Sequence, residues 1–155
     1  MPLNPAALDG QAFEATLLGL RVEKAALAIT AISTKALFTI TGRVQVRQIV
    51  GEVTTIIQAQ ANAGKLVFNP DGAGADTDLC ATLELNGDAV GLHYGITGTI
   101  ADAMIDGVQQ VKGQVAPLIL EAGSIGLNTA ASSTGAIKWT IWYVPLSDGA
   151  GIVAA

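Results

Sequence analysis

The chain has 155 residues, of which 50% are hydrophobic, and only 14% are charged, against a usual share of about 25%. The net charge of −5 and the scattering of the eight Lys and Arg residues exclude a typical nucleic-acid binder, which needs clustered positive charge to neutralise phosphates. The most apolar stretch, residues 25–32, is too short to cross a membrane, since a spanning helix needs about 18 to 20 apolar residues. The length favours one domain with its own hydrophobic core.

The N-terminal segment combines helix-forming residues with a regular apolar spacing. Phe13, Leu17 and Leu20 recur at positions i, i+4 and i+7 within residues 7–20, which places them on one face of a helix. Gly19 interrupts this stripe, and an extended arm that orders only on docking explains the segment equally well. The N-terminus also lacks the positive and apolar regions of a secretory signal peptide, so we expect synthesis in the cytoplasm without export by the general route.

From about residue 28 the apolar pattern changes to a period of two, which is typical of strands with one buried face. Many of these residues are β-branched, and such side chains favour strands. The predicted strands cover residues 38–41, 44–47, 51–58, 65–68, 79–85, 117–121, 124–130 and 136–144.

Turn-forming residues separate these strands. Residues 69–72, Asn-Pro-Asp-Gly, favour a tight turn, and residues 86–88, Asn-Gly-Asp, favour a hairpin because Asn and Gly accept positive φ. Residues 132–135 predict another hairpin connection. The stretch 100–113 is the least strand-like part of the second half and is expected to be a long loop or a short helix. Short strands separated by regular turns predict an all-β sandwich or barrel.

The sequence therefore predicts a single-domain β-sandwich, jelly-roll-like, over residues 29–146. Residues 1–28 are expected to form an N-terminal arm or helix, and residues 147–155 a C-terminal tail. The last strand places Trp139 on one face and Trp142 with Val144 on the other. Both faces are therefore expected to be covered, either within the domain's own core or by a neighbouring subunit.

The sequence offers few residues for catalysis. His93 is the only histidine and no Gly-x-Ser-x-Gly motif is present to supply a nucleophile, so we expect no catalytic residues and no enzyme activity. Cys80 is the only cysteine, which excludes an intrachain disulfide and a structural zinc site and favours a buried, inert thiol. Asp102 and Asp106 are four residues apart and could share one face of a helix. As a pair of carboxylates for glycoside hydrolysis they lack a nearby aromatic platform for the sugar, so we do not expect that activity.

Ion and cofactor binding are also not predicted. The acidic loop with Asp71, Asp76 and Asp78 has the oxygen ligands that calcium prefers, but its spacing does not match a calcium-binding loop, and a solvated loop is the simpler interpretation. The glycine-rich stretches lack the Lys and Ser/Thr of a phosphate-binding loop. We expect no metal and no cofactor.

Several blocks, taken in order, resemble a family of small head-associated proteins of tailed bacteriophages, the capsid decoration or cement proteins. The blocks are residues 36–42 (ALFTITG), 49–55 (IVGEVTT), 58–62 (QAQAN), 65–67 (KLV), 78–83 (DLCATL), 94–98 (YGITG), 136–139 (AIKW) and 143–146 (YVPL). The resemblance implies a β-sandwich subunit of the virion, often a homotrimer, that binds the major capsid protein from outside and stabilises the shell by cementing adjacent capsomers. It implies no catalytic residue.

Composition is consistent with an assembly role, because permanent interfaces are depleted in charge and rich in apolar area. The expected partners are further copies of the chain and the phage capsid protein, with no nucleic acid and no membrane. A tail, baseplate or head-fibre subunit is the alternative. A receptor- or carbohydrate-binding module is less well supported, because only 5% of residues are aromatic. The residues predicted to form interfaces are Leu3, Phe13, Leu17, Leu18, Leu20, Trp139 and Trp142.

Overall fold

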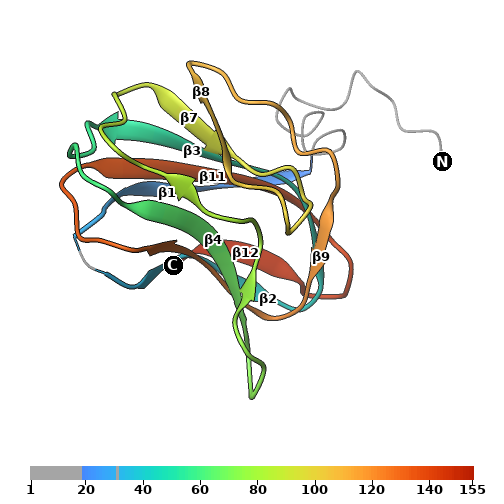
Figure 1. Ribbon diagram of the computed structural model, residues 1–155. Coiled ribbons are helices and arrows are strands. Elements are labelled where there is room, and N and C mark those ends of the chain that lie inside the picture. Colours follow the sequence, from blue (N-terminus) through green and yellow to red (C-terminus); the bar gives the residue numbers. More distant parts are fainter. Residues whose placement is uncertain (1–18, 31) are drawn as a thin grey trace, which may run out of the picture.

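The computed structural model describes residues 19–30 and 32–155, which form two antiparallel sheets packed face to face (Figure 1). Within these residues no helix is present, and the predicted all-β sandwich is confirmed. Sheet A has the order β1-β11-β3-β7-β8, and β9 also pairs with β3. Its strands are β1 (Leu20–Ala28), β3 (Val44–Thr55), β7 (Leu92–Gly95), β8 (Ile105–Val108), β9 (Leu118–Leu120) and β11 (Ala136–Pro145).

Sheet B has the order β12-β2-β10-β4-β5, and β6 also pairs with β4. Its strands are β2 (Thr34–Thr41), β4 (Ala63–Pro70), β5 (Thr77–Asp78), β6 (Leu83–Glu84), β10 (Gly123–Thr129) and β12 (Gly151–Ala154). Strands β4 and β5 form a hairpin whose loop, residues 71–76, projects from the body of the sandwich (Figure 1). The predicted Asn-Pro-Asp-Gly turn begins earlier than the loop, since Asn69 and Pro70 still belong to β4 and pair with β10. Within this loop, Gly72 has a φ of +93°, and outside its chain neighbours no atom lies within 4 Å of where its Cβ would stand.

Two turns that the sequence predicted as hairpins connect different sheets instead. Residues 86–88 lead from β6 in sheet B to β7 in sheet A, and residues 132–135 lead from β10 in sheet B to β11 in sheet A. Gly87 and Gly135 have positive φ, and the chain bends at both places. A turn fixes the local change of direction, but the partner of the following strand depends on contacts that lie far away in the sequence.

The predicted limits of the sandwich are too narrow at both ends. Residues assigned to the arm form β1, which pairs with β11 from Leu20 opposite Tyr143 to Ala28 opposite Ala136. Residues assigned to the tail form β12, which pairs with β2 and buries Ile152. The alanines of β1 hide its alternation, and its register shifts between Lys24 and Leu27. Residues 1–18, where the rest of the predicted arm or helix lies, are outside the described residues.

Two further expectations need correction. The predicted strand at residues 79–85 contains only the short strand β6, because β5 ends at Asp78, and Cys80 between them is buried as predicted. The stretch 100–113 contains strand β8 and no helix. Asp102 lies in a turn before β8 and Asp106 within it, so the two carboxylates do not share a helical face.

The core of the sandwich is built around strand β11. Its inward side chains, Ile137, Trp139, Ile141 and Tyr143, are all buried. Trp139 is fully buried and its ring stacks on Tyr94 with centroids 6.3 Å apart. Gly51, opposite Trp139 on β3, makes room for the indole, since a Cβ there would lie 2.9 Å from the ring. Trp139 is therefore a core residue, and the prediction that it contributes to an interface is not supported.

Replacement of Trp139 by alanine should destabilise the protein strongly, because the cavity left by the indole cannot be filled by the sheet around it. We expect the free energy of unfolding to fall by roughly 3 to 5 kcal/mol in denaturant titrations. Trp142→Ala, which removes a half-buried indole from the same strand, serves as the matched control and should cost less. A loss below about 1 kcal/mol for Trp139→Ala would contradict this account of the core.

The Tyr94 hydroxyl donates a hydrogen bond to the Asp88 carboxylate. Burial, that hydrogen bond and the charge of Asp88 raise the pKa of Tyr94 far above its usual value of 10.0. Above pH 10 the unfolded chain loses this proton while the folded protein keeps it, so stability should fall with pH. The slope due to Tyr94 is about 1.4 kcal/mol per pH unit. Urea titrations between pH 8 and about pH 11.5 should show a shallower decline for Tyr94→Phe than for the wild type; equal slopes would contradict the assignment.

Candidate interaction surface

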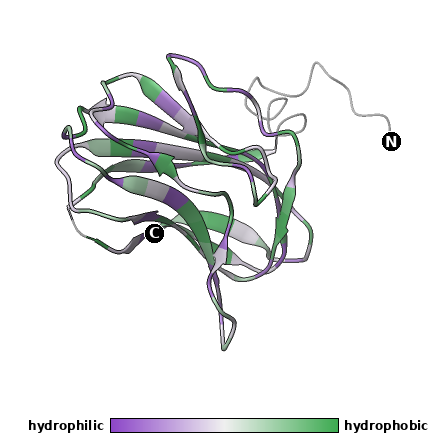
Figure 2. Ribbon diagram, in the orientation of Figure 1, coloured by the Kyte–Doolittle hydropathy of each residue, from purple (hydrophilic) through white to green (hydrophobic). Residues whose placement is uncertain are grey.

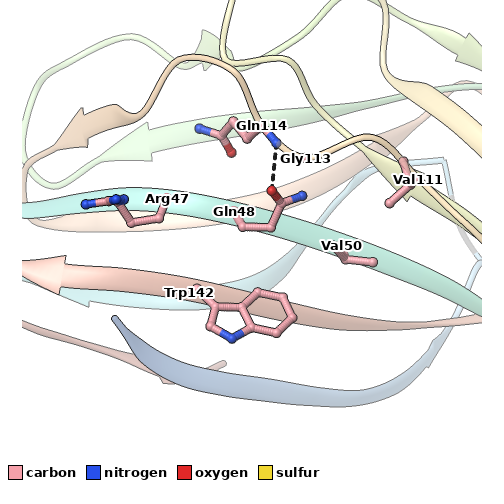
Figure 3. A pocket seen from close by; sticks show the side chains of 7 residues that line it. All are labelled: Arg47, Gln48, Val50, Val111, Gly113, Gln114 and Trp142. Carbon is pink, nitrogen blue, oxygen red and sulfur yellow. Dashed lines mark hydrogen bonds between the residues drawn. The ribbon is translucent and has the colours of Figure 1, made fainter. Parts of the chain in front are cut away.

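The outer face of sheet A carries an open cavity of about 450 Å³ near one end of strand β3 (Figure 3). We call this cavity the outer groove. Two strands and the loop that follows β8 contribute its walls. The lining residues are Arg47, Gln48, Val50, Val111, Gly113, Gln114 and Trp142.

A β-bulge in strand β3 explains why Arg47 and Gln48 both line this groove. In the pairing of β3 with β11, Gln48 lies opposite Trp142 and Val46 opposite Tyr143, so Arg47 has no partner of its own. Val46 and Ile49 both point into the core although they are three residues apart. The extra residue thus places two consecutive polar side chains on the outside of the sheet.

The loop wall of the groove is held by the side chains of Gln48 and Gln114. On the side away from β11, strand β3 pairs with β9 at one end and with β7 further along, which leaves a gap in the ladder around Gln48. The backbone N–H of Gln114 donates to the Gln48 Oε1 at 2.6 Å, and its Nε2 donates to the Ala116 carbonyl at 2.8 Å. Gly95 admits Val111 above β7, because a Cβ at residue 95 would lie 2.9 Å from a Val111 methyl carbon.

The groove combines apolar, amide and positively charged groups. Trp142, Val50 and Val111 supply apolar surface, and Arg47 extends along one side (Figure 3). The Oε1 of Gln114 is buried and accepts no hydrogen bond from residues 19–30 or 32–155. Arg21 on β1 lies opposite Trp142 on β11, so a second basic residue stands on the strand next to the groove.

Beyond the groove, the same face of sheet A carries an ion pair. The Lys138 ammonium on β11 lies 3.0 Å from the Glu52 carboxylate on β3. The hydrogen bond and the charge of Glu52, with a smaller contribution from Glu23, raise the pKa of Lys138. His93 on β7 lies on the other side of Glu52, and its buried Nδ1 has no hydrogen-bond partner in the described part of the chain.

Apolar side chains are exposed along the edge of the sandwich from β8 to β9, residues 108–120, which we call the β8–β9 rim. Val108, Val115 and Ile119 are 73%, 86% and 61% exposed. Strand β9 is hydrophobic throughout, as its colour in Figure 2 shows. The backbone N–H groups of Val115 and Ala116 both donate to the Thr97 carbonyl, at 2.9 and 3.0 Å, and so hold this segment against the body of the protein.

Of the three predicted interface residues that the structure describes, two lie at the surface and one is buried. Trp142 lies in the outer groove, and Leu20 is 43% exposed at the start of β1, one strand away. Trp139 is buried in the core. The remaining four residues, Leu3, Phe13, Leu17 and Leu18, lie outside the described residues.

Sequence reasoning did not identify the groove or the rim. The only sequence signal for the groove was the irregular spacing of Val46 and Ile49, which marks the bulge. The residues opposite it, Val111 and Gln114, lie in and directly after the stretch 100–113, in which the sequence predicted a loop or short helix but no contact with β3. The exposed valines of the rim lack any periodic signal.

The candidate metal residues are not gathered into a site. Within residues 19–30 and 32–155, no three His, Cys, Asp or Glu side chains are close enough to hold a metal ion. Asp78, one of the three acidic residues considered for calcium, forms an ion pair with Lys65 at 2.7 Å instead.

Burial raises the pKa of the Cys80 thiol. The described part of the chain contains no helix of the length and apolarity that crossing a bilayer requires.

Comparison with known proteins gives no match: no family model, no curated protein and no solved structure is similar to this chain.

Proposed function

We propose that the chain is a structural subunit that binds the outside of a tailed-phage head and cements adjacent capsomers, assembling there with copies of itself. The observation that carries the proposal is the β8–β9 rim, where three aliphatic side chains are largely exposed on a protein of only 14% charged residues. Aliphatic side chains exposed within one short segment are a candidate surface for another protein to cover. The sequence resemblance supplies the phage head as the place of assembly.

The rigidity of the sandwich and of the rim segment supports this role. A sandwich joined through a continuous core resists local deformation, and the rim segment is held by backbone hydrogen bonds to Thr97. A preorganised surface loses little conformational entropy on binding. The tail, baseplate or head-fibre alternative uses the same surface and differs in the particle to which the protein binds.

Binding to shells tests the proposal directly. Heads from a phage that lacks this protein are incubated with the purified chain and sedimented, and bound protein is quantified against tails treated in the same way. Full-length protein should sediment with heads. Sedimentation with tails alone would favour the alternative, and sedimentation with neither would contradict an assembly role in this virion.

Substitutions in the rim should weaken that binding without unfolding the protein. Val115→Ser combined with Ile119→Ser removes exposed apolar surface and is expected to lower the apparent affinity at least about tenfold, which is about 1.4 kcal/mol. Val153→Ser on β12 is the matched control, because Val153 and Ile119 are equally exposed at 61%. If the rim variant binds shells as tightly as the control, the rim is not the contact surface.

The protein is also expected to form a closed homo-oligomer, with a trimer as the specific proposal. Multi-angle light scattering at micromolar concentration should then give about three times the chain mass of 15.7 kDa. The rim variant serves as a second sample that shows whether the same apolar residues join the copies. A monodisperse species at the monomer mass would contradict the trimer.

A further inference from the structure

We infer that the outer groove is a binding site for a saccharide unit that carries a carboxylate, such as a hexuronic acid. This inference adds a ligand site to the protein and does not depend on the proposed role in a virion. Three features of the described residues support it: the size and the aromatic surface of the groove, the charge around it, and the polar atoms on its loop wall.

The groove has the size and the apolar surface that a sugar ring requires. Its volume of about 450 Å³ lies within the usual range of small-molecule sites. Trp142 is half-buried on β11, and its indole lines the groove beside Val50 (Figure 3). The apolar C–H face of a pyranose ring can pack against such a flat aromatic surface, which removes apolar area of both from water. One saccharide unit needs only one aromatic ring, so the low aromatic content of the chain does not exclude the site.

The charge around the groove favours an anionic group on the ligand. Arg47 belongs to the lining, which contains no Asp or Glu, and Arg21 stands on the nearby strand β1. The carboxylate of Glu52 on β3 pairs with Lys138 at 3.0 Å, and Glu23 adds to the negative charge around the same ammonium. A guanidinium can bind a carboxylate through two parallel hydrogen bonds, so Arg47 is suited to a carboxylate of the ligand.

The charge of the whole chain limits the number of negative groups on the ligand. A net charge of −5 repels a polyanion such as nucleic acid. Two arginines beside one groove suit a single carboxylate better than a row of phosphates. The ligand is therefore a single acidic sugar unit and not a polymer that is charged at every position.

The polar atoms of the loop wall suit a group that both donates and accepts hydrogen bonds. The Oε1 of Gln48 is used by the Gln114 backbone, and its Nε2 points the other way (Figure 3), 3.5 Å from the Ile49 carbonyl. The Nε2 of Gln114 is used by the Ala116 carbonyl, while its buried Oε1 accepts no hydrogen bond from the described residues. A buried acceptor without a donor is costly. Hydroxyl groups can accept from the first amide and donate to the second, whereas a carboxylate only accepts.

The backbone beside the groove favours a sugar over a peptide. A peptide that adds to a sheet uses a free run of backbone groups. Strand β3 pairs with β11 on one side, and on the other β9 covers residues 44–46 and β7 covers residues 50–52. The Gln114 side chain lies in the interval between them, with its Nε2 3.4 Å from the Val46 carbonyl. Recognition in the groove is thus left to side chains, as in sites for small polar molecules.

The indole N–H signals in a nitrogen–hydrogen correlation NMR spectrum test the inference on the full chain. Trp142→Phe identifies the signal of Trp142, since Trp139 is the only other tryptophan. D-glucuronic acid, D-galacturonic acid and N-acetylneuraminic acid are titrated separately, with D-glucose and D-galactose as neutral counterparts. At least one acidic sugar should shift the Trp142 signal to saturation, while the signal of the buried Trp139 stays in place. The neutral counterparts should bind at least about tenfold more weakly, because they lack the charged hydrogen bond.

A matched pair of arginine variants locates the carboxylate. Arg47→Gln removes the positive charge from the groove and should lower the affinity for the acidic sugar about tenfold, with little change for the neutral sugar. Arg43→Gln removes an exposed arginine that does not line the groove and should leave both affinities unchanged. Near-ultraviolet circular dichroism checks that both variants keep the environment of Trp139. Equal losses in the two variants would show non-specific attraction and overturn the inference.

Two further outcomes would also overturn the inference. One is that none of the three acidic sugars shifts the Trp142 signal. The other is that N-acetyl-aspartate methylamide, which has a carboxylate and peptide groups but no sugar ring, binds as tightly as the best acidic sugar, because the groove would then recognise an acidic peptide. The rim variant, Val115→Ser with Ile119→Ser, should keep its affinity for the sugar, so a failure of shell binding and a failure of sugar binding can be told apart.

Discussion

Strand β11 holds sheet A together and also supplies the core of the sandwich. It pairs with β1 on one side and with β3 on the other, over almost its whole length. Its inward residues meet sheet B, and Trp139 among them is the largest fully buried side chain. Because that indole packs against both Tyr94 and Gly51, the positions of β3 and β7 depend on it. The outer groove lies on the opposite face of these same strands, so the core determines its shape.

The groove itself depends on one inserted residue. Without the bulge at Arg47, strict alternation would turn either Arg47 or Gln48 toward the core, where an unpaired guanidinium or amide is costly. The bulge satisfies the core with Val46 and Ile49 and leaves both polar side chains outside. Gln48 can then fix the Gln114 backbone, which in turn fixes the loop wall. A local irregularity in one strand is thus the physical origin of the outer groove.

Much of the fold could be predicted from the sequence because alternation is a local property. Residues 38–41, 44–47 and 136–144 alternate clearly, and all three lie in strands of the structure. Strand β1 was mistaken for an arm or helix, because alanines at residues 25 and 26 carry little pattern and helix formers precede them. The assignment of turns to hairpins failed because the partner of a strand is set by distant residues. The groove joins Gln48 to Gln114, 66 residues apart, and no local pattern encodes such a contact.

The projecting β4–β5 loop has a practical consequence for work with this protein. The loop, residues 71–76, consists of two aspartates, two glycines and two alanines, and a side chain at Gly72 would point into open space. The strands that flank it are fixed by the pairing of Val67 and Phe68 with β5, so the ends of the loop stay close together whatever lies between them. Loop-closure entropy grows only slowly with length, which makes such a tip tolerant of added sequence. A peptide epitope inserted after Gly72 would be displayed away from both the groove and the β8–β9 rim, on every copy of the subunit.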